Sequence, residues 1–299
     1  MDFETICRKI EKLEIQGASN VAKHGIQALE VLLDEEAPKN KREAIEVLED
    51  AKNRLFQTRP TEPFLRNSVR YIVREAKKAE NVSTLIKTVE TSKSKFFRTI
   101  EEGKEKIAEV GSKRISGTIL THCHSSTAMG ILKRSKDDIE KVYVTESRPK
   151  YQGRISAREL LAEGIETVMI VDAACRHYMK EMDYCLVGSD VITSEGNVIN
   201  KIGTSSVALA ANEARIPFYV ATNLLKFDPE TISGALETIE ERNWKEVWKD
   251  KPKKLTIKNP AFDVTPEDYI DGLITEAGII SPEMIVHAIR DRFPWILAH

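Results

Sequence analysis

The stretch Thr118-Ile119-Leu120-Thr121-His122-Cys123-His124-Ser125 decides the fold class of this chain. It begins with a short run of β-branched and apolar residues, and a helix-like run through Lys133 follows it. This order predicts a β-strand that ends in a turn and opens a helix. A cysteine in such a turn lies near unpaired helix N–H groups, which lower the pKa of a thiol and attract anions. We therefore expect a low thiol pKa at Cys123 and a ligand site around it.

Strand-like and helix-like runs alternate on both sides of this stretch, from Gly111 to the end of the chain. The predicted strands are 118–121, 141–145, 167–171, 184–187, 217–221 and 269–274, and the predicted helices are 125–133, 156–163, 173–179, 204–213 and 282–290. Such alternation predicts a mostly parallel sheet with helices on both faces. The preceding residues show only helical periodicity. We therefore predict an α/β protein with a helical N-terminal domain, 1–112, and a Rossmann-like, doubly wound domain, 113–299.

The composition argues against several classes of partner. The 45 Lys and Arg residues nearly balance the 47 Asp and Glu residues, and the net charge of −2 offers no basic field for nucleic acid or an anionic membrane. No apolar run approaches the roughly 18 residues of a membrane span, and the charged N-terminus does not resemble a signal peptide. We therefore expect a cytoplasmic protein. Its cysteines should be reduced, because their spacing shows no pairs.

Polar residues follow five of the predicted strands, at 121–125, 145–149, 172–176, 188–190 and 221–223. In an open parallel sheet, ligands bind beyond the carboxyl ends of the strands, so this placement predicts a small-molecule site. Cys123 is the candidate acid, base or nucleophile, and the alternative is a buried core cysteine. Asp190 follows the small residues Gly188 and Ser189, and it is either a catalytic carboxyl or a helix cap.

The segment Asn200-Lys201-Ile202-Gly203-Thr204-Ser205-Ser206 combines an amide, an ammonium group, a glycine and three hydroxyls before a predicted helix. That chemistry suits a phosphate at a helix N-terminus. Lys226 and Arg59 could add cations, although isolated Lys and Arg side chains are more often only solvated. A metal held by His122, Cys123, His124 and His177 is the weaker alternative, because no ligand spacing supports a tetrahedral site. A hydrolase that pairs Cys123 with His177 likewise lacks a local signature.

Several blocks in fixed order resemble the family that unites the α, β and δ subunits of translation initiation factor 2B with two sugar-phosphate isomerases. The blocks are Thr121–Ser126, Thr145–Gly153, Asp172–Met179, Gly188–Thr193, Asn197–Thr204 and Asn259–Pro266, joined in the first half by Glu14–Ser19 and Gln57–Pro60. The resemblance covers nearly the whole chain and is strongest to the archaeal isomerases of ribose 1,5-bisphosphate. It implies an aldose–ketose isomerase of nucleoside monophosphate degradation, which needs no metal or organic cofactor.

The resemblance also implies roles for individual residues. It makes Cys123 and Asp190 the catalytic acid/base pair, which the non-catalytic subunits of the family generally lack. The implied substrate-binding residues are Gln16, Gly17, Ala18, Ser19, Arg59, Ser125, Ser126, Thr127, Asn200, Lys201 and Lys226. Gln16 departs from the isomerase pattern, which has arginine there, so a regulatory subunit and a methylthioribose 1-phosphate isomerase stay open as alternatives. The resemblance further implies a dimer-based homo-oligomer, a hexamer in the archaeal isomerases, and activation by AMP.

Overall fold

A computed structural model of the chain describes residues 1–235 and 239–298. These residues form two compact units. One comprises Met1–Glu102 together with Ala298, and the other comprises Gly103–Leu297. Each unit is described below by itself.

The first unit is helical, as predicted. Its helices are α1 (Phe3–Glu11), α2 (Ala18–Glu36), α3 (Lys41–Thr58), α4 (Pro63–Lys77) and the first part of α5 (Val82–Ser112), which continues into the second unit. Local sequence sets the helix starts. The side chain of Asp2 accepts a hydrogen bond from the Thr5 N–H at the start of α1, and Asn40 accepts one from Glu43 N–H at the start of α3. Apolar faces of α2 and α4 then pack against each other to form the core of this unit.

The second unit contains a seven-stranded sheet with the order β10-β9-β7-β4-β1-β2-β3. Its strands are β1 (Gly117–Thr121), β2 (Ile139–Thr145), β3 (Thr167–Ile170), β4 (Tyr184–Val187), β7 (Phe218–Ala221), β9 (Gly272–Thr275) and β10 (Gly278–Ile280). All neighbours pair in parallel except β10, which pairs antiparallel with β9. The predicted fold class is therefore confirmed.

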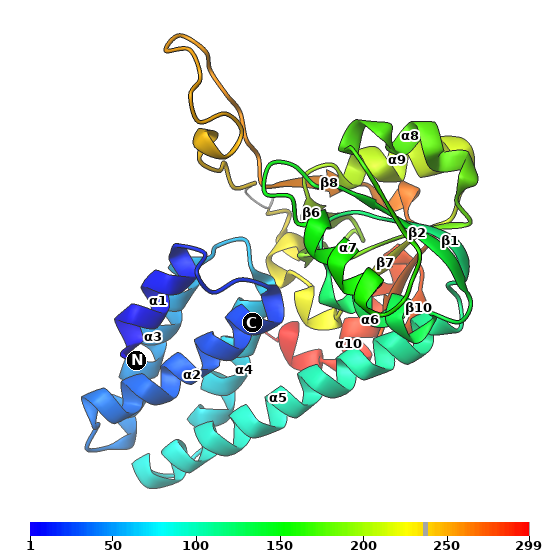
Figure 1. The fold of residues 1–299 in the computed structure, drawn as a ribbon. Helices are drawn as coiled ribbons and strands as arrows, with labels where there is room; N and C mark the ends of the chain where they lie inside the picture. Colours follow the sequence, from blue (N-terminus) through cyan, green and yellow to red (C-terminus); the bar gives the residue numbers. More distant parts are fainter. Residues whose placement is uncertain (236–238, 299) are drawn as a thin grey trace. The chain divides into compact units, whose positions relative to one another are not determined.

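Helices cover both faces of this sheet. They are α6 (Ser126–Arg134), α7 (Gly153–Ala162), α8 (Cys175–Tyr178), α9 (Thr204–Ala214) and α10 (Ile285–Arg292). Figure 1 shows α6 and α7 on one side of the sheet and α8 and α9 on the other. The core joins the apolar strands to α6, where a Cβ on Gly111 of α5 would come within 2.4 Å of Ile131. This close fit packs the end of α5 against α6.

A second, three-stranded antiparallel sheet was not predicted from the sequence. It consists of β5 (Val191–Ile192), β6 (Val198–Lys201) and β8 (Phe262–Thr265), in the order β5-β6-β8. Its first strand has only two residues and its second ends in Asn and Lys, so neither gives a clear strand pattern. The sheet places Asn200 and Lys201 in a strand that the sequence analysis did not predict.

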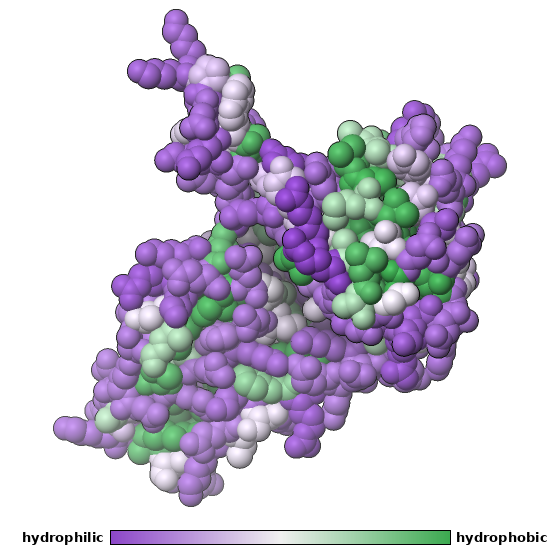
Figure 2. All heavy atoms as spheres, viewed as in Figure 1, coloured by the Kyte–Doolittle hydropathy of each residue, from purple (hydrophilic) through white to green (hydrophobic). Residues whose placement is uncertain are grey.

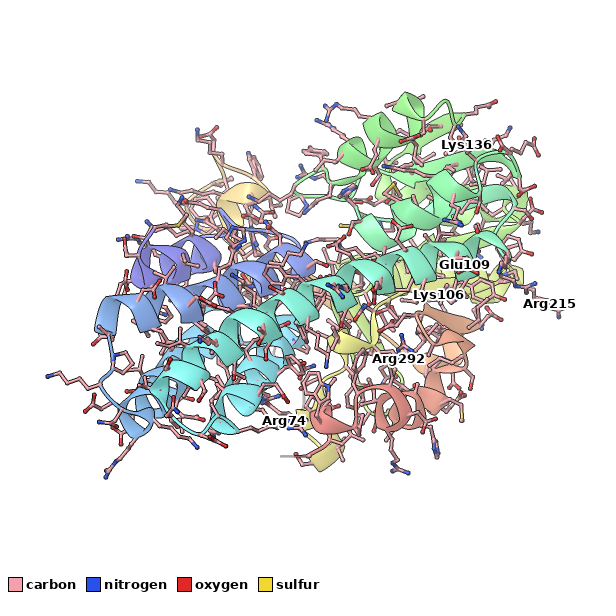
Figure 3. The ribbon with its side chains drawn as sticks, turned by 90° about the horizontal axis from the view of Figure 1, so that it is seen from below. Arg74, Lys106, Glu109, Lys136, Arg215 and Arg292 are labelled. Carbon is pink, nitrogen blue, oxygen red and sulfur yellow. The ribbon has the colours of Figure 1, made fainter. Side chains whose placement is uncertain are left out.

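Charged side chains cover much of the surface of both units. In Figure 3 the labelled Lys106 and Glu109 project from α5, and their Nζ and Oε2 atoms lie 2.9 Å apart. Figure 2 shows one departure on the second unit, where apolar side chains gather beside α7. Exposed apolar residues of α7 and of the β3 region are Ile155, Leu161, Met169 and Val171. No helix among residues 1–235 and 239–298 combines the length and the apolar character needed to cross a membrane.

Candidate active site

The ends of β1 and β4 mark the point where the chain reverses its direction across the sheet. From β1 the strand order runs through β2 to β3 on one side, whereas β4 and then β7 lie on the other side. In a doubly wound sheet, the crevice outside such a switch point is the usual place for a ligand. Cys123 comes two residues after β1, and Asp190 comes three residues after β4. The two residues proposed as catalytic therefore follow the two strands that flank the switch point.

The backbone of Cys123 is held in a conformation that few non-glycine residues adopt. Its φ angle is +67°, in the left-handed region. The Cys123 N–H donates to Ser147 Oγ at 2.8 Å, and the Cys123 carbonyl accepts from Ser156 Oγ at 2.8 Å. Cys123 is partly exposed, whereas Cys7, Cys175 and Cys185 are buried. Backbone strain that persists at a partly exposed residue is typical of functional sites.

The low thiol pKa that the sequence predicted for Cys123 is wrong. Burial raises the pKa of this thiol to about 11, and the negative charges of Asp190 and Asp172 add to the shift, while Lys201 opposes it. Ser125 caps the N-terminus of α6, since its side chain accepts a hydrogen bond from the Ala128 N–H. The thiol is therefore protonated at neutral pH, which suits a proton donor better than a thiolate nucleophile.

The loop after β2 supports Cys123 from the neighbouring strand end. The Asp172 carboxylate accepts the backbone N–H of Ser147 at 2.7 Å and that of Arg148 at 2.8 Å. This carboxylate fixes the loop whose Ser147 hydroxyl binds Cys123. His124 is engaged elsewhere, because its Nδ1 lies 3.1 Å from Ser156 Oγ and its Nε2 lies 3.7 Å from Glu159 Oε2.

The loop that carries Asp190 packs directly against the start of α6. A Cβ on Gly188 would lie 2.3 Å from Ser125 Oγ, so only glycine allows this approach. The buried Lys226 reaches the same loop, where its Nζ donates to the carbonyl of Ser189. The Asp190 N–H donates to the Ile199 carbonyl at 2.9 Å. Four of the predicted site residues, Cys123, Ser125, Asp190 and Lys226, are thus joined through adjacent loops.

Lys201 and Asn200 lie at the end of β6, close enough for the Lys201 charge to affect the Cys123 thiol. Lys201 Nζ donates to the Ala261 carbonyl at 3.1 Å and lies 5.2 Å from the centre of the Phe262 ring. Asn200 is buried, and its Nδ2 donates to Thr204 Oγ1 at 3.0 Å. A fixed ammonium group beside the thiol is suited to bind a phosphate or a developing oxyanion.

The phosphate site that the sequence predicted at the start of α9 is already filled by a side chain. The Asp263 carboxylate accepts the N–H of Gly203 at 2.7 Å and that of Ser205 at 3.2 Å, and burial raises the pKa of Asp263. A carboxylate at this position competes with a phosphate for the same N–H groups. The N–H groups at the start of α9 are therefore no longer part of the candidate site. Lys201 and Asn200 stay part of it through their side chains.

Two predicted binding elements belong to the helical unit. In the turn of Gln16, Gly17, Ala18 and Ser19, Gly17 has a φ angle of +83° and gives α2 no side-chain cap. Gln16 is exposed, and its Nε2 donates to the Leu13 carbonyl at 2.5 Å. Arg59 is mostly buried, and its Nη2 lies 3.5 Å from Glu62 Oε2. Ser126 and Thr127, by contrast, form the first turn of α6 in the second unit.

Sequence reasoning missed Gln152. Its Oε1 atom is buried and has no hydrogen-bond partner among residues 1–235 and 239–298. Gln152 follows the loop that supports Cys123 and precedes α7. A buried amide oxygen without a partner marks a place where a ligand hydroxyl could donate a hydrogen bond. The glycine that follows it, Gly153, was the available signal, because glycine is used where another part of the chain approaches closely.

Gly153 offers a direct test of that packing. A Cβ at this position would lie 1.8 Å from the Thr145 carbonyl oxygen, so Gly153→Ala must displace the end of β2. We expect the substitution to lower the free energy of unfolding by about 3 kcal/mol or to prevent folding. Gly130→Ala is the matched control, since its Cβ would meet only Ala108 at 3.7 Å. Urea unfolding should separate the two variants, and equal midpoints would contradict the packing described here.

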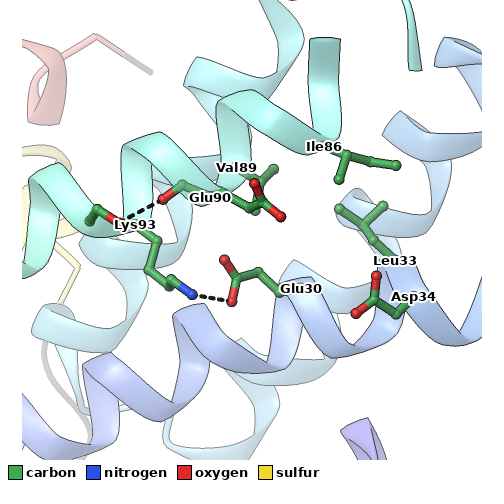
Figure 4. Close-up of a pocket in the computed structure, with 8 residues that line it drawn as sticks. Glu30, Leu33, Asp34, Ile86, Val89, Glu90 and Lys93 are labelled. Carbon is green, nitrogen blue, oxygen red and sulfur yellow. Dashed lines mark hydrogen bonds and ion pairs between the residues drawn. The ribbon is translucent and has the colours of Figure 1, made fainter. Parts of the chain in front are cut away.

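A cavity of about 250 Å³ lies in the helical unit, and none of the candidate site residues lines it. Figure 4 shows it between α2 and α5, lined by Glu30, Asp34 and Glu90 together with Lys93, whose Nζ lies 2.5 Å from Glu30 Oε2. Three acidic side chains disfavour a phosphorylated ligand there. In the described ranges, 1–235 and 239–298, no three His, Cys, Asp or Glu side chains gather as a metal site would require.

Comparison with known proteins shows the family to which this chain belongs. The chain is 42% identical to the ribose 1,5-bisphosphate isomerase of Archaeoglobus fulgidus, over 95% of this chain and 91% of that protein. It is 40% identical to the protein of the same name from Pyrococcus furiosus, over 97% and 94%. The crystal structure of the Pyrococcus horikoshii translation initiation factor eIF-2B matches with a TM-score of 0.80 and 33% identity, over 94% of this chain and 97% of that one. The model of the initiation factor 2 subunit family matches residues 14–282. The chain therefore belongs to the initiation factor 2 subunit family.

Proposed function

We propose that this chain is an isomerase that converts ribose 1,5-bisphosphate to ribulose 1,5-bisphosphate. One observation carries the proposal. The protonated thiol of Cys123 lies within the influence of the Asp190 and Lys201 charges, at the switch point of the sheet. Two groups that can hold protons and one fixed cation suit acid/base chemistry on a phosphorylated sugar. The names of the relatives from Archaeoglobus and Pyrococcus furiosus support the same reaction.

The reaction needs a proton donor, because a phosphate occupies the anomeric oxygen of the substrate. The ring can open only when the bond from C1 to the ring oxygen breaks and the ring oxygen takes a proton. In our proposal the Cys123 thiol donates that proton. The hydrogen on C2 then moves to C1, and the C2 hydroxyl gives its proton to Asp190, which leaves a ketone at C2. Water then carries a proton from Asp190 to the Cys123 thiolate, which restores both groups for the next turnover. No metal ion or organic cofactor takes part in this proposal.

Two phosphates require two anion sites. We assign one phosphate to Lys201, Lys226 and the α6 start, where Ser125, Ser126 and Thr127 supply hydroxyls. For the helical unit, the Gln16–Ser19 turn and Arg59 stay the substrate-binding residues that we propose from the family pattern. Gln16 supplies no charge where the isomerase pattern has arginine, and the missing charge-assisted contact weakens binding by about 1.5–3 kcal/mol.

A regulatory subunit is the second candidate, and Gln16 is the observation that favours it. The two candidates differ in what the purified chain should do. As an isomerase it should convert ribose 1,5-bisphosphate, supplied by nucleoside monophosphate degradation, and AMP added to the assay should raise the rate. As a regulatory subunit it should convert no sugar phosphate and should bind a translation factor.

A pair of substrates tests the assignment. We expect kcat/KM to be at least about 100-fold lower for methylthioribose 1-phosphate than for ribose 1,5-bisphosphate, because the former lacks the second phosphate and its charge-assisted contacts. Gln16→Arg should lower KM for the bisphosphate about tenfold by restoring one such contact. Higher efficiency on methylthioribose 1-phosphate would contradict the assignment in favour of the related sugar-1-phosphate isomerase.

We also propose that the chain assembles with copies of itself, as dimers that build a hexamer. The β3 strand lies at the edge of the sheet. Met169 in this strand is 42% exposed, and Val171 directly after it is 57% exposed. An apolar sheet edge of this kind is suited to contact a second copy. Light scattering on Val171→Asp should give a smaller particle than the unsubstituted chain, and an unchanged mass would remove this edge from the interface.

A further inference from the structure

His122 is a fully buried histidine whose two ring nitrogens both have partners. Nδ1 lies 2.6 Å from Thr145 Oγ1, and Nε2 lies 2.9 Å from the Ile202 carbonyl oxygen. A carbonyl oxygen can only accept, so Nε2 carries the proton. In the neutral ring Nδ1 then accepts the hydrogen bond of the Thr145 hydroxyl. The surroundings of His122 therefore define a single tautomer.

The hydrogen bonds continue from Thr145 to the backbone of Cys123. Thr145 Oγ1 lies 3.3 Å from Ser147 Oγ, and Ser147 Oγ accepts the Cys123 N–H at 2.8 Å. Since Thr145 donates to His122, the hydrogen of the Ser147 hydroxyl is left for Thr145 Oγ1 and for the Thr145 carbonyl oxygen, which lies 3.4 Å from Ser147 Oγ. The chain thus has one direction, from the Cys123 N–H through two hydroxyls to His122, and from His122 to the carbonyl of Ile202. Hydrogen bonds aligned in this way strengthen one another.

The charge state of His122 decides this direction. Burial lowers the pKa of His122, with Lys201 acting in the same sense and Asp172 and the Ile202 carbonyl opposing it. A protonated ring would carry a hydrogen on Nδ1 as well, and Thr145 could no longer donate to it. The lowered pKa therefore favours the neutral ring, in which Thr145 donates to Nδ1 and the chain runs in the direction described.

We infer that His122 is a positioning residue that fixes Cys123 and Lys201 relative to each other. One ring nitrogen acts on the Cys123 side through Thr145 and Ser147. The other binds Ile202, which directly follows Lys201 in the chain. The inference rests on the proposed function for its meaning in catalysis. Its physical content, the support of the Cys123 loop, can be tested without any substrate.

Two substitutions separate the two sides of the ring. Glutamine in His122→Gln can place an amide N–H near the position of Nε2, but it has no atom at the position of Nδ1. Asparagine in His122→Asn offers an oxygen near the position of Nδ1 and does not reach Ile202. The Gln variant therefore breaks the Cys123 side, and the Asn variant breaks the Lys201 side.

The first readout is the rate at which iodoacetamide alkylates Cys123, measured by intact mass. The other three cysteines are buried, and Cys123→Ser shows the background. We expect His122→Gln to speed alkylation at least about threefold, because a loosened loop exposes the thiol, whereas His122→Asn stays within about twofold. Thr145→Val should behave like His122→Gln, and Thr145→Ser, which keeps the hydroxyl, should restore the slow rate. These Thr145 variants decide the matter if His122→Gln does not fold.

The second readout is the division of the defect between kcat and KM. His122→Gln should lower kcat at least about tenfold, whereas His122→Asn should mainly raise KM, by at least about fivefold. His177→Gln is the control, since His177 is exposed on α8. Equal alkylation rates in the Gln and Asn variants, or failure of Thr145→Ser to restore the slow rate, would overturn the inference. Absence of turnover in the unsubstituted chain, with the expected alkylation pattern, would overturn only the proposed function.

Discussion

Cys123→Ser and Asp190→Asn are each expected to lower kcat for ribose 1,5-bisphosphate by about 1000-fold or more, with little change in KM. Proton transfer by a positioned side chain contributes about 10²–10⁴-fold to a rate, and each variant removes one of the two groups. A serine hydroxyl is a far weaker acid than a thiol whose pKa is about 11, so it cannot replace Cys123 as the donor.

The kcat of the double variant should be at most about tenfold lower than that of either single variant, because the effects of groups that act on the same transition state are not additive. Cys185→Ser is the matched control, since Cys185 lies fully buried in β4 and takes no part in the site. Steady-state kinetics on folded proteins measures all four variants. A Cys123→Ser variant that retains a tenth of the activity would contradict the assignment of the thiol as the proton donor.

Glu276→Gln is expected to stabilise the protein at pH 8 by about 3 kcal/mol and to change little at pH 4. Glu276 is 5% exposed and follows β9, and burial raises its pKa to about 7 from the usual 4.5. Its carboxyl group accepts the Leu224 N–H at 3.2 Å. The positive charge of Arg292 of α10, labelled in Figure 3, opposes the shift without overcoming it.

The sign follows from the raised pKa. The folded state favours the protonated carboxyl, so the stability that Glu276 contributes is complete below about pH 4.5 and is lost as the pH rises through about 7. Glutamine imitates the protonated form at every pH and escapes this loss. Urea unfolding of both proteins between pH 4 and pH 8 measures the difference. Parallel pH profiles would show that burial does not raise the pKa of Glu276.

The arrangement of the large sheet could be predicted from the sequence because its strands are apolar runs bounded by turns. The strand around Leu120 and the strand Tyr184–Val187 appear where alternation predicted them. Their neighbours in the sheet could also be inferred, since parallel strands with short connections have few possible orders. The positions of Cys123 and Asp190 at strand ends follow from the same pattern.

What escaped prediction depends on contacts between residues far apart in the chain. The Asp263 carboxylate accepts the Ser205 N–H at the start of α9, although the two residues are 58 positions apart in the sequence. No local sequence pattern indicates this hydrogen bond. The raised pKa of Cys123 reflects burial together with the charges of Asp190 and Asp172, groups that only the folded chain brings together. The hydrogen bonds of His122 similarly join β1, β2 and β6.

The most direct test of the central claim is the fate of C2 in ribose 1,5-bisphosphate labelled there with ¹³C. Our proposal predicts that the purified chain converts the alcohol signal of C2 into a ketone signal, and that the Cys123→Ser and Asp190→Asn variants leave the alcohol signal in place. An alcohol signal that persists in the presence of the folded, unsubstituted chain would contradict the assignment of this protein as a ribose 1,5-bisphosphate isomerase.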